Sequence, residues 1–332
     1  MKRIFLLVLV FAMSLMLFGC KEKSNSSTSF MQKLSDTEGY KVEGVLEAFF
    51  ENGRRQNEFC VYYKKPDNIK VVLKSVENND KQIILKKSED VYVLVPSVNK
   101  SFKIKSSWPT NASYPYLLQS LAKDIANDKD LITSETDTTY TIQTKIKMHA
   151  DADAVNQKII FSKETSLPTE VLIYEADGDL FTRCVFTNID LNYKPNDEEF
   201  DIDKSMTSAY LTFGENGLEF KNRSFDLPTY CPEGLTLKAN ENVKKGTDAR
   251  SVMLFSGEKN LTIVQELVNY NKTMKTCAET GELVMVMDTV GIMNTNSIKF
   301  VFEGIEYTVA SNTLAKSELL NVSSSYMQAS NK

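Results

Sequence analysis

Six short runs of β-branched and aromatic residues follow one another between residues 40 and 105, and they constrain the fold more than any other feature. Several of them alternate apolar and polar side chains, which is the pattern of a half-buried strand. Asn, Asp, Gly or Pro residues separate the runs, as expected for turns. The runs are YKVEGVLEAFF, NEFCVYYKKP, NIKVVLKSV, KQIILKKS, DVYVLVPSV and KSFKIKS. Their regular spacing predicts a meander of antiparallel strands.

A helical segment then interrupts the strand pattern. In the stretch SWPTNASYPYLLQSLAKDIANDKDL, apolar side chains recur at helical intervals at Leu117, Leu118, Leu121 and Ile125. Strand-like runs return in TYTIQTKIKM, NQKIIFSKET, PTEVLIYEAD and LFTRCVFTNIDLNY. This order predicts an α+β, mainly β fold, in which helices cover one side of a strongly curved antiparallel sheet.

The composition and the remaining pattern predict a second, smaller unit. The 332 residues are 42% hydrophobic and 25% charged, which is enough for two domains. We assign residues 31–204 to the curved-sheet domain and the polar residues 205–222 to a linker. Residues 223–332 contain further strand-like runs and end in LAKSELLNVSSSYM, so they are predicted to form a small α+β domain with a terminal helix.

The N-terminus has the form of an export signal. Lys2 and Arg3 precede an apolar stretch that is shorter than the roughly 20 residues of a membrane span. The stretch ends in LFGC, which resembles a lipobox, the signal in which the cysteine receives a diacylglyceryl group. We therefore predict a signal peptide at residues 1–19, a lipid on Cys20 and a polar tether at 20–30. An uncleaved anchor is the alternative, and both interpretations place the folded part on the extracytoplasmic face of the cell membrane.

Four further cysteines leave two interpretations open. No CxxC spacing occurs, so neither a thioredoxin motif nor a ribbon-type zinc site is supported. Exported proteins can form disulfides, and pairing within each predicted domain would join Cys231 with Cys277 and Cys60 with Cys184. Free, buried cysteines are the other interpretation.

The sequence offers little for catalysis or for nucleic-acid binding. The net charge is −5 without a basic stripe, so no nucleic-acid partner is predicted. His149 is the one histidine in the sequence, and we predict an exposed turn residue there rather than a catalytic group. The neighbouring carboxylates Asp177 and Asp179, and Glu198 and Glu199, are interpreted as turn and surface charges. We predict no enzyme, no metal site and no cofactor.

The order of several short motifs resembles a known superfamily. From about Met31 to Asp203, the segments YYKKPDNIKVVL, VYVLVPSVNKSFKI, YPYLLQSL and QKIIFSKETSLPTEVLIYEADGDLFTRCVFTNIDLNYKPNDEEFDI are similar to LolA/LolB/RseB-like proteins. The C-terminal segments LPTYCPEGL, LTIVQE, FEGIEYTVASN and KSELLNVSSSY resemble the C-terminal domain of sporulation lipoproteins of the YdcC type. The first domain is also similar to germination lipoproteins of the GerS type. Together the two resemblances cover nearly all of the mature chain.

The resemblance implies an incomplete barrel whose concave face takes acyl chains or partner proteins. Matching positions that would line such a groove are Val61, Tyr63, Ile69, Val71, Val93, Phe102, Leu117, Leu118, Ile160, Leu172 and Val185. The alternative is that these side chains are simply core. At Lys70 the sequence departs from the Arg of the carriers, which removes a guanidinium contact.

Two functions follow from the resemblance and the predicted anchor. The first is a non-enzymatic, membrane-anchored binding or scaffold protein in sporulation or germination, which holds an envelope partner such as a cell-wall-modifying enzyme. The second is a carrier or sensor of lipids or lipoprotein acyl chains. Because a shuttle should be soluble and Cys20 would fix the chain to a membrane, we favour the first.

Overall fold

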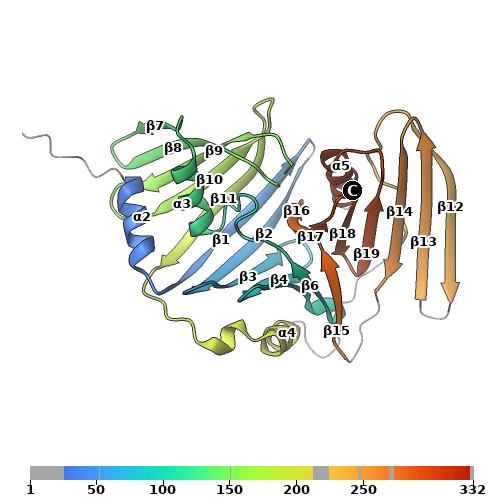
Figure 1. Ribbon diagram of the computed structural model, residues 1–332, viewed down its shortest axis with the longest axis horizontal. Coiled ribbons are helices and arrows are strands. Elements are labelled where there is room, and N and C mark those ends of the chain that lie inside the picture. Colours follow the sequence, from blue (N-terminus) through green and yellow to red (C-terminus); the bar gives the residue numbers. More distant parts are fainter. Residues whose placement is uncertain are drawn as a thin grey trace, which may run out of the picture.

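Two β-sheets make up most of the molecule (Figure 1). The computed structural model describes residues 26–51, 53–149, 151–211, 224–245, 248–268 and 273–329. The predicted signal peptide, Cys20 and residues 212–222 of the predicted linker lie outside the described residues. The mainly β, curved-sheet fold class is confirmed.

The larger sheet has 12 strands in the order β15-β6-β5-β4-β3-β2-β1-β11-β10-β9-β8-β7. Neighbouring strands pair antiparallel, except for the parallel pair of β15 and β6. The strands are β1 (Gly39–Phe50), β2 (Gly53–Lys64), β3 (Asn68–Ser75), β4 (Lys81–Lys87), β5 (Asp90–Val95), β6 (Lys100–Lys105), β7 (Ile132–Glu135), β8 (Thr139–Ile146), β9 (Val155–Ser162), β10 (Pro168–Tyr174), β11 (Leu180–Asp190) and β15 (Lys275–Thr280). The predicted meander is therefore present.

The smaller sheet has 7 antiparallel strands in the order β12-β13-β14-β19-β18-β17-β16. These are β12 (Leu235–Lys245), β13 (Asp248–Gly257), β14 (Asn260–Leu267), β16 (Glu282–Val286), β17 (Thr289–Met293), β18 (Ser297–Phe302) and β19 (Ile305–Ala310). The described helices are α2 (Ser26–Asp36), α3 (Leu118–Asn127), α4 (Ile202–Leu211) and α5 (Lys316–Ala329), with 3-10 turns η2 (Pro96–Val98) and η3 (Asp197–Phe200). The helices predicted around Leu118 and at the C-terminus are confirmed.

One face of the larger sheet, which we call the inner face, carries a ladder of buried apolar side chains. Across β1 to β6 the register aligns Val42, Val61, Val71, Ile84, Val93 and Phe102. Across β1, β11, β10, β9 and β8 it aligns Leu46, Cys184, Val171, Ile159 and Ile142. A bulge between Glu43 and Gly44 lies between these two rows. A Cβ on Gly44 would lie 2.2 Å from the Val185 carbonyl oxygen, so a larger residue would push the paired strands apart.

The segment from Trp108 to Ile125, which we call the plug, packs against the inner face. Its largest side chains, Trp108 and Tyr116, are 0% exposed, and they belong to the same core as the ladder. Helix α3 forms the second half of the plug and contacts α2 and β8. Phe30 of α2 meets Phe161 of β9 at a ring distance of 5.4 Å. The chain therefore fills the concavity of its own sheet. This packing is favourable because it removes the apolar surfaces of both the plug and the sheet from water.

A buried carboxylate in the plug gives the first testable prediction. Asp124 accepts hydrogen bonds from Ser113 Oγ at 2.8 Å and Gln157 Nε2 at 3.3 Å, and burial raises its pKa to about 6. Because the native state holds this proton more tightly than the unfolded chain, the free energy of unfolding is expected to fall as the pH rises from about 4 to about 6. Asp80 contributes to the same fall in the free energy of unfolding, since burial raises its pKa to about 6 as well.

We expect Asp124→Asn to raise the free energy of unfolding near pH 7 by about 1–3 kcal/mol. The amide stays neutral, and Gln157 Oε1, which has no partner among the described residues, can accept from it after a flip. Urea unfolding near pH 4 and near pH 7 measures the effect, with the exposed Asp130→Asn as control. A variant that shows the full pH dependence of the unsubstituted protein would contradict the assignment.

Some of the smaller sheet's apolar side chains join the core of the larger sheet, and the rest form a second core with α5. Leu283, Val290, Ile292 and Val301 of the smaller sheet lie in the same apolar cluster as the ladder. Strand β15 leaves the smaller unit and pairs with β6, where Thr276 and Ser101 hydroxyls are 2.8 Å apart. Residues 275–280 of the predicted C-terminal domain therefore complete the N-terminal sheet.

A buried polar seam also joins the sheets. Arg55 Nε of β2 donates to Asp288 Oδ1 at 2.8 Å, and Asn57 Nδ2 donates to the Asp288 carbonyl at 2.6 Å. Gln82 of β4 bridges in both directions: its Nε2 donates to the Val301 carbonyl at 3.0 Å, and its Oε1 accepts from Val290 N at 2.7 Å. These bonds satisfy polar groups that would otherwise destabilise a buried interface.

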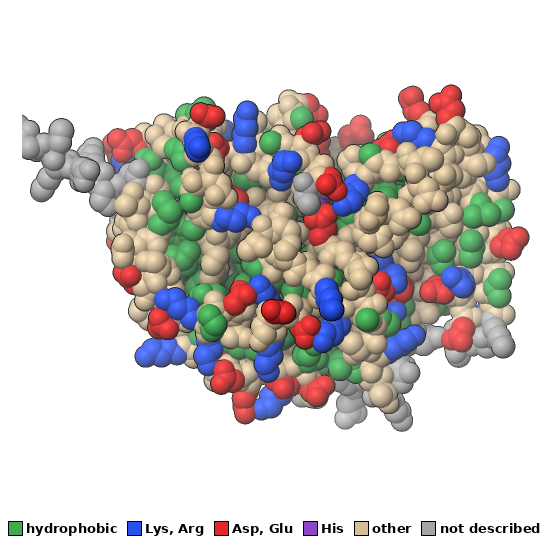
Figure 2. All heavy atoms as spheres, viewed as in Figure 1, with side chains coloured by type: hydrophobic (Ala, Val, Ile, Leu, Met, Phe, Trp, Pro, Cys, Tyr) green, Lys and Arg blue, Asp and Glu red, His purple; other side chains and the backbone are tan. Residues whose placement is uncertain are grey.

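The opposite side of the larger sheet, the outer face, is covered only in part. Helix α4 occupies residues 205–211 of the predicted linker, and its Met206 and Ala209 pack against Ile83 and Leu94. No helix in the described ranges is long and apolar enough to cross a membrane. The visible surface mixes charges of both signs, and hydrophobic side chains also reach it over β12 and β13 (Figure 2). The exposed ones on these two strands are Leu237, Val243 and Leu254.

Candidate functional site

Eight of the eleven predicted groove residues meet on the inner face, where the plug packs against them. They are buried or nearly so: Val61, Tyr63, Ile69, Val71, Val93, Phe102, Leu117 and Leu118. Leu117 and Leu118 belong to the plug itself, so they fill the concavity rather than line it. The structure thus gathers these side chains into one core, with the space between them occupied by the protein's own chain.

The other three predicted groove residues lie on the outer face, which corrects their predicted direction. Ile160, Leu172 and Val185 are each half-buried, and their strand neighbours Ile159, Val171 and Cys184 point inward instead. Because successive side chains of a strand alternate between faces, a shift of one residue reverses the direction. Ile160 and Val185 flank Glu170 in the register, in a row of mixed polarity.

The predicted disulfides are not formed. Cys60, Cys184, Cys231 and Cys277 are all free. Cys184 points to the inner face from β11 and is fully buried, whereas the half-buried Cys60 lies on β2, with β1 between the two strands. Cys277 lies in β15 on the larger sheet, while Cys231 packs beside the core of the smaller sheet. Both pairings are therefore wrong: β1 separates Cys60 from Cys184, and Cys231 and Cys277 pack against different cores.

A cleft of about 450 Å³ lies where one end of the larger sheet meets α5; we call it the α5 cleft. Three parts of the chain form it: the loop from β8 to β9, the turn from β10 to β11 with its strand ends, and the first turns of α5. Its apolar lining includes Met148, Val155, Ile173, Phe181 and Leu320. This size and lining are typical of small ligand-binding sites.

The rim of the α5 cleft carries more carboxylates than cations. Lys316 Nζ of α5 lies 2.6 Å from Asp151 Oδ2 and 3.3 Å from Glu282 Oε1, so its charge is already matched. Asp153 and Glu175, by contrast, face no cation within hydrogen-bonding distance among the described residues. Burial, followed by the charges of Asp177 and Asp179, raises the pKa of Glu175. The opening is therefore negative overall.

His149 lines the α5 cleft and is buried, at 5% exposure, so the prediction of an exposed turn residue is wrong. The residue lies in a bend after β8, where the loop folds under α5 instead of extending into solvent. Burial lowers the pKa of His149, which favours the neutral ring. Its Nδ1 has no hydrogen-bond partner among the described residues. Nδ1 itself is enclosed by protein and is not part of the accessible surface of the cleft.

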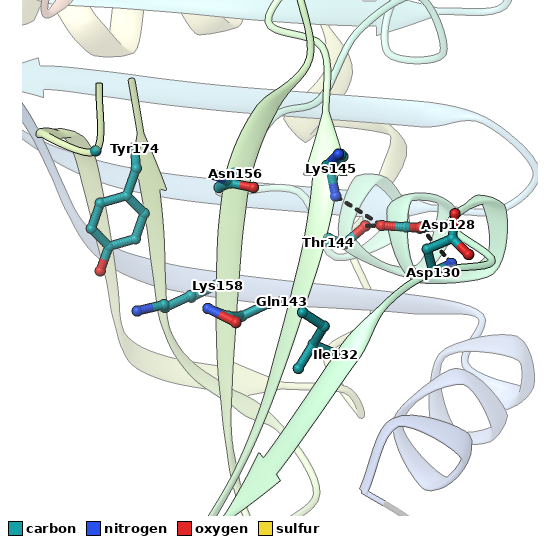
Figure 3. A pocket seen from close by; sticks show the side chains of 10 residues that line it. Asp128, Asp130, Ile132, Gln143, Thr144, Lys145, Asn156, Lys158 and Tyr174 are labelled. Carbon is teal, nitrogen blue, oxygen red and sulfur yellow. Dashed lines mark hydrogen bonds between the residues drawn. The ribbon is translucent and has the colours of Figure 1, made fainter. Parts of the chain in front are cut away.

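A second hollow, of about 400 Å³, lies on the outer face over β7 to β10 (Figure 3). The Asp128 carboxylate at its edge accepts from Thr144 Oγ1 at 2.7 Å and from Lys145 N at 2.8 Å. The Lys158 ammonium lies 5.0 Å from the centre of the Tyr174 ring on the neighbouring strand. These contacts connect the strands, and the hollow lacks the apolar lining of the α5 cleft.

The carboxylate pairs and metal-type residues show no catalytic arrangement in the described part of the chain. Glu199 caps η3 by accepting from Asn196 N at 3.1 Å and also accepts from Tyr193 Oη at 2.6 Å. Glu198 pairs with Lys204 at the surface, while Asp177 and Asp179 are exposed in a turn. No three His, Cys, Asp or Glu side chains among the described residues converge in a way that could hold a metal ion.

Comparisons with known proteins give one family and several distant structural likenesses. Residues 1–200 match the family model described as sporulation protein YdcC-like. The sporulation protein YdcC of Bacillus subtilis (strain 168) is 27% identical over 322 residues, covering 96% of this chain and 95% of that protein.

The similar solved structures include complexes. The Pseudomonas aeruginosa MucA/MucB complex contains a chain 12% identical to this one, with a TM-score of 0.32, over 90% of this chain and 97% of that one. The complex of the CwlD amidase with the GerS lipoprotein from Clostridioides difficile contains a chain 13% identical, with a TM-score of 0.31, over 53% and 97%. A LolA superfamily protein from Nitrosomonas europaea is 12% identical, with a TM-score of 0.32, over 53% and 98%.

Proposed function

The chain belongs to the family of YdcC-like sporulation proteins, and from this premise we propose that it is a stationary, non-enzymatic binding platform in the cell envelope. A lipid on Cys20 holds it to the outer face of the cell membrane, and the folded part binds an envelope protein during sporulation. The export signal and the LFGC sequence support the anchor. The family membership supports the role in sporulation.

One observation favours a platform over a carrier of acyl chains. The inner face of the curved sheet, where a carrier would hold its cargo, is occupied by Trp108, Tyr116 and the rest of the plug. An acyl chain could enter only if these side chains left, which would expose a large apolar area to water. The alternative function, a carrier or sensor of acyl chains, therefore requires a rearrangement that a platform does not.

The lipid anchor gives the second prediction. We expect the unsubstituted protein, expressed in its source bacterium and fed an alkyne fatty acid, to carry the label and to sediment with membranes. Cys20→Ser should lose the label and retain residues 1–19, because the thiol that accepts the lipid is gone. Cys231→Ser, which removes another thiol, should change neither. Label that persists in Cys20→Ser would reject the anchor.

Sporulation itself tests the rest of the proposal. In a strain without the chromosomal copy, the unsubstituted protein should restore the yield of heat-resistant, germinating spores, and Cys20→Ser should restore less. Equal restoration by Cys20→Ser would show that the anchor is dispensable. If the deletion strain and its parent gave the same spore yield, the proposed role in sporulation would be contradicted.

A further inference from the structure

The α5 cleft combines two properties that bear on what it can bind. Its lining is mainly apolar and includes Met148 of the loop after β8, Ile173 of β10, Phe181 of β11 and Leu320 of α5. Its rim carries the carboxylates of Asp153 and Glu175, which face no cation among the described residues. Apolar side chains favour an apolar occupant, while unmatched carboxylates favour positive charge. A ligand that satisfies the cleft must provide both.

The arrangement of the charges selects among ligands of that kind. Asp153 comes from the loop between β8 and β9, whereas Glu175 comes from the turn after β10, so the two carboxylates approach from separate segments. An anionic lipid surface is disfavoured, because its phosphates would meet the same carboxylates. A peptide can place cations on both sides of one apolar side chain, which matches two carboxylates that approach from separate segments.

We propose that the α5 cleft binds a segment of a partner protein in which one apolar side chain is flanked by lysine or arginine. The apolar side chain enters between the sheet and α5, and the flanking cations pair with Asp153 and Glu175. Lys316 does not oppose them, since Asp151 and Glu282 already neutralise it. This site rests on the proposed function, of which it would be the docking surface.

Fluorescence anisotropy with defined peptides tests the site on the full chain in non-ionic detergent. The labelled probes are GGKFKGG, its charge-reversed counterpart GGEFEGG and the polar GGKSKGG. We expect GGKFKGG to bind at least about tenfold more tightly than either of the others. Its affinity should also fall between about 50 mM and about 500 mM salt, because the paired charges are at the surface.

Variants locate the binding. The double substitution Asp153→Lys with Glu175→Lys should weaken GGKFKGG about tenfold and strengthen GGEFEGG. Ala176→Trp, at an exposed lining position, should block the cleft without changing its charge. Glu241→Lys on β12, an exposed carboxylate outside the cleft, is the matched control and should leave binding unchanged.

Three results would overturn the proposal. They are no measurable binding of GGKFKGG, equal binding of all three peptides, and affinities that stay unchanged when the cleft residues are substituted. Benzylamine that competes as well as the peptide would indicate a small-amine site instead. These outcomes are independent of the Cys20 labelling and the spore yield, so a failed cleft leaves the anchored platform standing, and a failed anchor leaves the peptide site standing.

Discussion

Replacing Asp288 with alanine is expected to lower the free energy of unfolding by about 3–5 kcal/mol, since it leaves the Arg55 charge buried without its counter-ion. The Arg55 and Asp288 side chains are 1% and 3% exposed and form an ion pair at 2.8 Å between the two sheets. Two other contacts of Arg55 would remain, with the Met327 carbonyl at 3.3 Å and with the Phe302 ring. Neither contact neutralises a guanidinium.

Urea unfolding followed by circular dichroism measures this effect. Asp197→Ala is the matched control, because Asp197 pairs with Lys64 at the surface and is 91% exposed, so its loss should leave stability nearly unchanged. The double variant Arg55→Met with Asp288→Leu should recover much of the loss, since it removes both buried charges. An Asp288→Ala protein as stable as Asp197→Ala would show that the pair does not hold the sheets together.

Trp108→Ala is expected to destabilise the protein by about 3–5 kcal/mol, because a fully buried large side chain leaves a cavity. Trp108 is 0% exposed and packs edge-on against Tyr114 at a ring distance of 5.9 Å. Its indole Nε1 has no hydrogen-bond partner among the described residues, so Trp108→Phe, which keeps much of the volume and removes the buried N–H, should cost far less. Urea unfolding of the two variants gives the comparison.

Trp108→Ala also distinguishes the function of a binding platform from that of an acyl-chain carrier. In native mass spectrometry with added fatty acid, the unsubstituted protein should remain free of ligand, whereas Trp108→Ala opens apolar space under the plug and should admit one. Stoichiometric fatty acid on the unsubstituted protein would show that the plug moves and would favour the carrier. Uptake by neither protein would show that the plug closes around the gap.

The strands and helices were predictable because each carries its own local pattern. The alternation in β3, NIKVVLKS, matches its alternating burial, and the helical spacing of Leu118, Leu121 and Ile125 matches the buried side of α3. In β9 and β10 apolar residues follow one another directly, as in Ile159–Ile160 and Val171–Leu172, and β11 has Cys184–Val185, so the pattern does not show which side chain points inward. Ile160, Leu172 and Val185 were therefore placed on the wrong face, although their strands were correct.

The α5 cleft could not be predicted, because its residues come from three segments that only the folded chain brings together. The polar neighbours of His149 in KMHADADAV indicate exposure, yet the residue is buried and lines a cleft together with α5. Lys316, Asp151 and Glu282 form one ion cluster although they are far apart in sequence. The position of the plug could not be predicted either. An apolar run predicts that its side chains are buried, but not which surface they pack against.

Strand β15 determines the order in which the molecule can be completed. Ser101 and Thr276 are 175 residues apart in sequence and meet across the edge of the larger sheet. During synthesis, β6 therefore remains an open edge until β15 has emerged, and open edges recruit other strands. We therefore expect the larger sheet to form slowly, because its last strand pairing joins segments that are far apart in sequence. Until β15 pairs with β6, the N-terminal sheet is exposed to aggregation.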